Sequence, residues 1–248
     1  MTAGSSAALA LIYFVTALVT VVTGSTSLIA IPVMLQFGME PRTAVATNMV
    51  ALAMLSFGGT LPFIRTDAID RSRVPWMVSL TLAGSAAGAL LLFSVPAKWM
   101  TLIIPVAMIV VLVMLVFQPK EGAVARPRAG YASVAVLSVY GGFLSGGYAT
   151  LLTAAGILFF RYPFLRAMAM SRLLNTASSL VAVAVFAWFG IIDWRLGMVL
   201  SVAAFLGGLL GSHWARKMPA ALLRRLFIVA VAILAVKSLI FDVPWREY

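Results

Sequence analysis

Two short polar stretches that contain glycine interrupt long apolar runs of this chain, and their residue types could bind a solute. The first stretch contains Gly24, Ser25, Thr26 and Ser27, and the second contains Gly146, Gly147, Tyr148 and Thr150. A helix that begins at such a break offers backbone N–H groups and the positive end of its dipole, and nearby hydroxyls add donors. This chemistry suits an anion. The alternative is that the hydroxyls only satisfy backbone groups freed at a kink.

Arg172 is the second candidate, because it lies two turns inside the apolar segment 164–189. Placing a charge in a membrane costs at least about 2.5–3.5 kcal/mol on insertion scales, so we expect Arg172 to face a cavity or a partner such as an anion. The alternative is that its side chain snorkels to the interface. The site predicted around Arg172 is completed by Ser171, Asn175 and, from the first half of the chain, Thr47 and Asn48.

The residue types that are missing narrow the chemistry further. All seven acidic residues lie in connectors or tails, so none is placed to coordinate a cation or relay protons within the membrane. A single histidine, His213, and the absence of cysteine leave no catalytic triad, thiolate site or disulfide. We therefore expect no enzymatic activity, no cofactor and no metal.

The elements that position these residues are predicted to be membrane-spanning helices. Of 248 residues, 63% are hydrophobic and 10% are charged, against about 25% charged in soluble proteins. Eight apolar segments recur, at about 7–37, 43–64, 74–95, 99–117, 131–160, 164–189, 196–214 and 222–241. This pattern predicts an all-α polytopic membrane protein. We assign the net charge of +11 to contacts with lipid head groups rather than nucleic acid, because the basic residues lie at segment ends.

The second half of the chain repeats the first after a shift of 123 residues. The shift pairs Gly24 with Gly147, Ser56 with Ser179, Asp70 with Asp193, Gly84 with Gly207, Gly88 with Gly211, and Pro96 with Pro219. We predict a first transmembrane repeat at 1–118, a linker at 119–130 and a second repeat at 131–248. The G-x-x-x-G spacings at Gly84 and Gly207 predict close helix packing within one subunit, with a homodimer seam as the alternative.

The distribution of arginine and lysine decides between two topologies. If both broken segments cross the membrane, eight basic residues lie on each side. If each re-enters on the face it came from, twelve share one side and Arg42, Lys98, Arg195 and Arg246 share the other, which is a positive-inside pattern. The second topology gives three crossings per repeat, so the repeats are inverted, as in secondary transporters. Eight spans in parallel repeats remain the alternative.

The ordered motifs resemble the TauE/SafE family of sulfite exporters, also called the 4-toluenesulfonate uptake permease family. They are the broken first segment, the runs I-P-V-M-L at 31–35 and A-V-A-T-N at 44–48, the echo 123 residues later, and G-I-I-D-W at 190–194. The resemblance covers nearly the whole chain and implies a bacterial plasma-membrane permease for small sulfur-containing anions. The chain departs from the family at Gly24-Ser25-Thr26, where members often have consecutive glycines, and at Ala155, which stands opposite Pro32.

The expected function is therefore export of a small sulfur-containing anion, such as sulfite or an organosulfonate, by a secondary transporter. A negative-inside potential of 100 mV favours exit of an anion by about 2.3 kcal/mol per charge, so export needs no coupling ion. The expected partners are the anionic substrate and the lipid bilayer. Three alternatives stay open: an anion channel with the same site, an ion-coupled uptake permease for organosulfonates, and a membrane scaffold that transports nothing.

Overall fold

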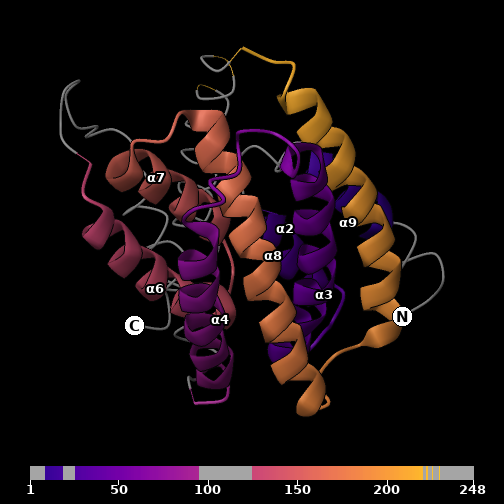
Figure 1. Ribbon diagram of the computed structural model, residues 1–248. Coiled ribbons are helices and arrows are strands. Elements are labelled where there is room, and N and C mark those ends of the chain that lie inside the picture. The colour runs from indigo at the N-terminus through magenta and orange to yellow at the C-terminus, as the bar shows by residue number, and fades with distance from the viewer. Residues whose placement is uncertain are drawn as a thin grey trace.

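The computed structural model describes residues 9–18, 26–94 and 125–219 and the single positions 222, 225 and 229. Within these residues the protein is all-helical and contains no strand, which confirms the predicted class. The helices are Leu9–Leu18, α2 (Thr26–Gln36), α3 (Pro41–Thr60), the short η1 (Leu61–Phe63), α4 (Val74–Leu91), α6 (Pro127–Phe143), α7 (Tyr148–Phe160), α8 (Phe164–Trp188) and α9 (Trp194–Ala215) (Figure 1). The predicted segment 99–117 and nearly all of 222–241 lie outside the described residues.

Four of the described helices are long and apolar enough to cross a membrane. They cover Pro41–Phe63, Val74–Leu91, Phe164–Trp188 and Trp194–Ala215. Each rises about 1.5 Å per residue, so 18 to 25 residues span the roughly 30 Å of a hydrocarbon core. They match four of the predicted segments, and the helix α7 is shorter, as a break in segment 131–160 requires.

Acidic residues in the connectors set where two of these helices begin. The Glu40 carboxylate accepts from the Thr43 backbone N–H (2.8 Å) at the start of α3, where Pro41 occupies the first turn. The Asp193 carboxylate accepts from the Leu196 N–H (3.0 Å) at the start of α9. Such caps satisfy N–H groups that have no partner inside the helix, so short polar connectors suffice to end one span and begin the next.

The helices pack in a bundle in which α8 lies between α3 and α4, with α9 against α3 and α6 against α4 (Figure 1). The helices α3 and α8, which the shift of 123 residues predicts to be equivalent, run in opposite directions. Thr47, near the start of α3, accepts a hydrogen bond from the Asp193 N–H beyond the end of α8 (3.0 Å). At the other end, the backbone N–H of Asp70, which follows α3, contacts the Met170 sulfur near the start of α8 (3.3 Å).

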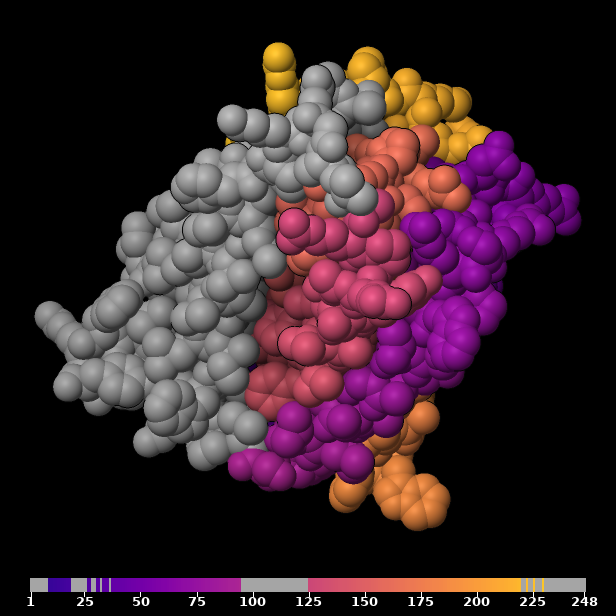
Figure 2. Space-filling view, turned by 60° about the vertical axis from the view of Figure 1, so that its left-hand side comes forward, coloured from indigo at the N-terminus to yellow at the C-terminus, as the bar shows by residue number. Residues whose placement is uncertain are grey.

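The contact between α4 and α6 is close because glycines form it. A Cβ placed on Gly88 would lie 1.8 Å from the carbonyl oxygen of Val139, a distance at which no side chain fits. Beside it, the Ser85 hydroxyl donates to the Ser138 carbonyl (3.1 Å). Figure 2 shows the two helices in contact along their sides. The predicted packing of the glycine faces within one subunit is thus confirmed for Gly84 and Gly88, and Gly207 packs in the same way against Ala17.

Helices α6 and α7 form a hairpin whose two open ends lie at the same end of the bundle. The Arg126 N–H donates to the Phe159 carbonyl (2.9 Å), which joins the start of α6 to the end of α7. Helix α6 begins at Pro127, earlier than the predicted residue 131, because proline is favoured in a first helical turn. We call this the basic end, because most described basic residues lie there: Arg65, Arg71, Arg73, Arg126, Arg128, Arg161, Arg166, Arg216 and Lys217. Arg42 and Arg195 lie at the opposite end.

Candidate functional site

The start of α7 is a buried helix N-terminus, as the break at Gly146-Gly147 predicts. Gly147 adopts a left-handed conformation (φ 75°) at the N-cap, and the helix begins at Tyr148. Residues from 141 to 156 are all buried, so this end of the dipole lies inside the protein. A dipole in such low-dielectric surroundings attracts an anion more strongly than it would in water.

Ser145 is a residue that the sequence reasoning missed. It has φ 59°, which is uncommon for a residue other than glycine, and it lies three residues before Tyr148, where α7 starts. Its hydroxyl is buried and has no hydrogen-bond partner among the described residues. A buried polar group without a partner is costly, so this hydroxyl is available to a bound solute or water. A serine directly before two glycines was the available signal.

Tyr148, which was predicted to contact the solute, links the hairpin to the bundle in the described structure. Its phenol is fully buried and forms a 2.9 Å hydrogen bond with the Ser138 hydroxyl, and Ser138 donates to Thr81 on α4 (3.2 Å). The ring lies against Gly141, where a Cβ would stand 2.8 Å from three ring atoms. The carbonyl of Gly146 accepts from the Tyr140 hydroxyl within the hairpin. These contacts hold the start of α7 in place.

Helix α8 brings three predicted site residues to two different neighbours. The Thr153 hydroxyl of α7 lies 2.9 Å from the Ser171 hydroxyl of α8. Thr153 is one helical turn beyond Thr150, which is also buried. On the face toward α3, the Asn175 amide donates to the Ser56 hydroxyl (2.7 Å). The Asn175 carbonyl oxygen and the Ser179 hydroxyl, one turn farther along α8, have no hydrogen-bond partner among the described residues.

Arg172 lies between these two contacts on the same helix. It is 1% exposed and is among the largest fully buried side chains in the described structure. Its guanidinium therefore lies within the protein, and the alternative of snorkelling to the interface is wrong. The membrane-spanning helices that the structure describes contain no carboxylate. A buried positive charge in a low-dielectric interior that holds no carboxylate on these helices would stabilise a small anion that reached it.

The first half of the chain also buries hydroxyl and amide groups at the start of a helix. Thr26 and Ser27 are buried at the start of α2, and the Ser27 hydroxyl accepts from the Asn48 amide on α3 (3.0 Å). The Asn48 carbonyl oxygen accepts from the Tyr13 hydroxyl, a partner that sequence reasoning did not identify. Thr47 points elsewhere, to the backbone of Asp193. Gly24 and Ser25, which were also predicted to bind the solute, lie outside the described residues.

Comparison with known proteins adds a family assignment to this geometry. A sequence profile described as "Sulfite exporter TauE/SafE" matches residues 9–238. The "Probable membrane transporter protein YfcA" of Escherichia coli (strain K12) is 28% identical over 232 residues, which are 91% of this chain and 86% of the relative. The "Probable membrane transporter protein" of Haemophilus influenzae is 25% identical over 241 residues, 95% and 94% of the two chains. A third relative, "Probable membrane transporter protein ORF9" of Sinorhizobium sp, is 26% identical over 232 residues, 91% and 89%. No solved structure matches this chain.

Proposed function

The chain belongs to the sulfite exporter TauE/SafE family, and on this premise we propose that it exports a small sulfur-containing anion as a secondary transporter. Sulfite and organosulfonates are the substrates we expect. The observation that carries the proposal is the burial of Arg172, at 1% exposure, within a helix long enough to span the membrane. The insertion of such a charge costs at least about 2.5–3.5 kcal/mol, and a bound anion that pairs with it would offset part of this cost.

The polar groups around the two buried helix starts support the same substrate class. Ser27 with Asn48, and Ser171 with Thr153, place hydroxyl and amide donors beside the start of α2 and on α7. Donors without a carboxylate select for an anion over a cation. The oxygens of a sulfite or sulfonate group can accept several such hydrogen bonds at once, and the Ser145 hydroxyl is a further donor at the start of α7.

Contacts between the two halves of the chain support inverted repeats. The shift of 123 residues takes Asp70 to Asp193 and Thr47 to Met170. The contact between Asp70 and Met170 therefore corresponds to the contact between Asp193 and Thr47. A second pair behaves alike. The Ser85 and Ser178 hydroxyls form a 2.7 Å hydrogen bond, and at the shifted positions Gly208 packs on the Leu55 carbonyl. The antiparallel arrangement of α3 and α8 is what a twofold axis in the membrane plane would produce, as in inverted-topology transporters.

The hairpin of α6 and α7 supports a re-entrant segment. Both of its open ends lie at the basic end, so Arg126 and Arg161 share one side of the membrane. By the positive-inside rule that side is the cytoplasm. The start of α7 would then lie within the membrane, reached by a helix of 13 residues, about 20 Å long. Inside-negative potential drives an anion outward from this site, which favours export.

Anion binding tests the site directly. We expect sulfite, thiosulfate, sulfate, sulfoacetate or taurine to raise the melting temperature of purified protein in detergent, since a ligand at 100 times its Kd adds about 2.7 kcal/mol. Arg172→Gln should abolish the shift, and the matched control Arg195→Gln, at an exposed position at the opposite end, should keep it. Arg172→Lys, which keeps the charge, should keep part of it. Stabilisation by the same anion in Arg172→Gln would contradict the proposed site.

Flux measurements separate a transporter from the alternatives. Proteoliposomes loaded with unlabelled substrate should accumulate labelled sulfite by counterflow, and an inside-negative potential should speed net exit. Flux that is linear in concentration and shows no counterflow would favour a channel. Vesicles that show no flux above empty ones with any of these anions would favour the scaffold.

Cysteine accessibility tests the topology, because the natural chain contains no cysteine. Ala125→Cys and Pro163→Cys flank the α6–α7 hairpin, and Arg195→Cys lies at the opposite end. We expect an impermeant thiol reagent added outside cells to label only the third variant. Labelling of one hairpin variant but not the other would mean that the broken segment crosses the membrane.

A further inference from the structure

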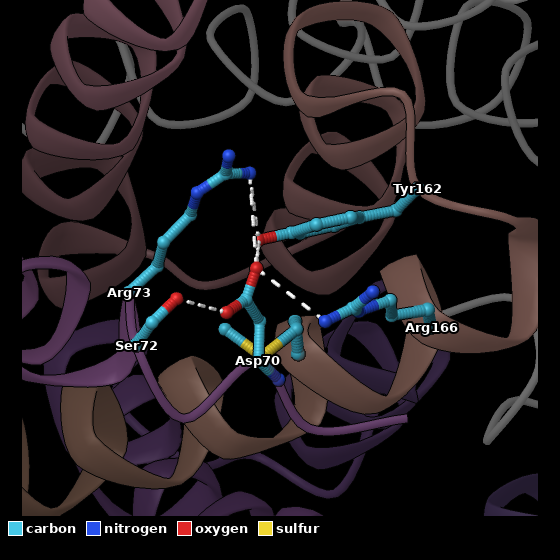
Figure 3. Close-up of polar contacts among 6 residues, drawn as sticks. Asp70, Ser72, Arg73, Tyr162 and Arg166 are labelled. Carbon is cyan, nitrogen blue, oxygen red and sulfur yellow. Dashed lines mark hydrogen bonds and ion pairs between the residues drawn. The ribbon is translucent and has the colours of Figure 1, made fainter. Parts of the chain in front are cut away.

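The basic end holds a compact cluster in which one carboxylate lies among two arginines and a tyrosine (Figure 3). The Tyr162 hydroxyl donates to Asp70 Oδ2 (2.7 Å), and the Ser72 hydroxyl donates to Oδ1 (2.6 Å). A guanidinium nitrogen of Arg166 lies 3.5 Å from Oδ2 and one of Arg73 lies 3.7 Å from it. We refer to these five residues as the Asp70 cluster.

The Asp70 cluster joins three separate elements of the bundle. Asp70 and Ser72 belong to the connection between α3 and α4, Tyr162 to the turn between α7 and α8, and Arg166 to the first turns of α8. The Arg166 guanidinium also lies over the Tyr162 ring, 5.0 Å from its centre. The cluster therefore links the end of the α6–α7 hairpin to the α3–α4 connection at the basic end.

The charges within the cluster do not cancel. Two guanidinium groups face a single carboxylate, so one positive charge is in excess. The side chains of Arg73 and Arg166 are 30% and 37% exposed, which lets both reach solvent. Moreover, the Arg166 Nε–H is buried and has no hydrogen-bond partner among the described residues. Both features are those of a site for an anion larger than one carboxylate.

The protonation states favour the same arrangement at neutral pH. Burial acts to raise the pKa of Asp70, but hydrogen bonds from Ser72 and Tyr162 and the charges of Arg166 and Arg73 lower it below its ordinary value. Burial, together with the hydrogen bond to Asp70, raises the pKa of Tyr162 to about 12, so its hydroxyl remains a donor. An anion that replaced the carboxylate would meet three of these four groups, Tyr162, Arg73 and Arg166, at the turn and helix ends of the basic end.

Helix packing by itself does not require this cluster. Asp193 is the repeat equivalent of Asp70 and likewise precedes a span, yet its carboxylate caps α9. The positions equivalent to Arg73, Tyr162 and Arg166 are Leu196, Met39 and Thr43, none of which is charged. We therefore infer that the two arginines and the tyrosine have a role at the basic end other than helix packing.

We propose that Arg73, Arg166 and Tyr162 form an anion-receiving site at the basic end, which the Asp70 carboxylate occupies while that end is closed. An arriving oxyanion exchanges with Asp70 for the two arginines, and the α3–α4 connection then parts from the hairpin. The inference rests on the proposed function, since the arriving anion is the transported one. Exchange of one anion for another leaves the arginines paired throughout, which keeps the opening step low in energy.

The experiment measures opening through a buried probe. The probe is the substitution Leu174→Cys. Leu174 is 2% exposed and lies on α8, one turn deeper than Met170, and the chain has no other cysteine that could react. The rate of labelling by N-ethylmaleimide in detergent reports how readily this buried position becomes accessible, and the Asp70 and Tyr162 variants report whether the basic end controls it. Sulfoacetate is the probe anion, because it does not react with maleimides, and chloride at equal ionic strength is its control. Asp70→Asn is compared with Asp67→Asn, an exposed acidic residue in the same connection.

We expect sulfoacetate to speed labelling in the parent and in Asp67→Asn. In Asp70→Asn, labelling should be faster by about tenfold without any anion, which corresponds to about 1.4 kcal/mol, and should no longer respond to sulfoacetate. Tyr162→Phe keeps the ring under the arginines but removes one hydrogen bond to Asp70, and should give an intermediate rate. It also serves if Asp70→Asn does not fold.

Two results would overturn the inference, and they differ in what else they overturn. If the parent shows sulfoacetate counterflow but Asp70→Asn and Tyr162→Phe label at the parent's rate, the anion-receiving site is refuted and the proposed function stands. If the parent carries none of the screened anions in proteoliposomes, the proposed function fails and the inference fails with it.

Discussion

The replacement Gly88→Ala tests whether the contact of α4 with α6 holds the hairpin in place. The added Cβ would lie 1.8 Å from the Val139 carbonyl oxygen, whereas such carbon–oxygen contacts need about 3.3 Å. Because the obstacle is backbone, no rotamer change relieves it, and the helices must separate by roughly 1.5 Å. The hydrogen bond from Ser85 to the Ser138 carbonyl, now 3.1 Å, would then be lost.

The expected cost follows from three terms. Overpacking costs about 1–3 kcal/mol, and the lost hydrogen bond costs about 0.5–1.5 kcal/mol. The higher helix propensity of alanine stabilises the helix by up to about 1 kcal/mol relative to glycine. These terms sum to a net loss of roughly 0.5–4.5 kcal/mol, and the central value of about 2.5 kcal/mol lowers the melting temperature by about 5–10 °C for a chain of this size. Intrinsic tryptophan fluorescence of the purified protein measures it.

Gly197→Ala is the matched control, since it makes the same chemical change on another membrane-spanning helix. Its Cβ would meet the Val50 side chain at 3.5 Å, an ordinary contact. This variant should be as stable as the parent or slightly more stable. Gly88→Ala should also slow anion flux, because the start of α7 would shift with the hairpin. A melting temperature for Gly88→Ala equal to or above that of Gly197→Ala would refute the reasoning.

Two further predictions concern buried polar groups. Asn48→Ala leaves the Tyr13 hydroxyl without its acceptor and should cost about 1–3 kcal/mol of stability. Combined with Tyr13→Phe it should cost less than the sum of the single changes, as melting of all three variants would reveal. The pKa of Asp70 is lower in the folded protein, so its stabilisation is complete above about pH 4 and lost as pH falls through the folded pKa. Melting temperatures between pH 3 and 6 should lose this acid dependence in Asp70→Asn and keep it in Asp67→Asn.

Much of the fold was predictable, because membrane helices depend on local properties of the chain. The lengths of the apolar runs predicted the spans that begin at Pro41, Val74, Phe164 and Trp194. The glycines before Tyr148 predicted the start of α7, since few other residues adopt a left-handed backbone. Arg172 was recognisable from sequence because a charge in an apolar run is costly wherever the helix packs.

The composition of the candidate site was less predictable. Thr47 and Asn48 are neighbours in sequence and were assigned to one site, yet successive helical residues point about 100° apart. Asn48 therefore meets Ser27, and Thr47 meets the backbone of Asp193. Ser145 was missed although its place directly before two glycines was a signal, and Tyr13 was missed because a tyrosine in an apolar run carries no signal of which polar group it will meet.

The sequence by itself determined the membrane-spanning helices, the break that begins α7 and the chemistry available at it, since these follow from hydropathy and backbone preference along the chain. Tertiary structure alone decided which of these groups meet. Asp70 faces Arg166 only because α3 and α8 run in opposite directions and bring the end of one helix to the start of the other. Arg172 is buried rather than snorkelled because neighbouring helices cover that face of α8. Such contacts depend on the packing of whole helices, which no local pattern records.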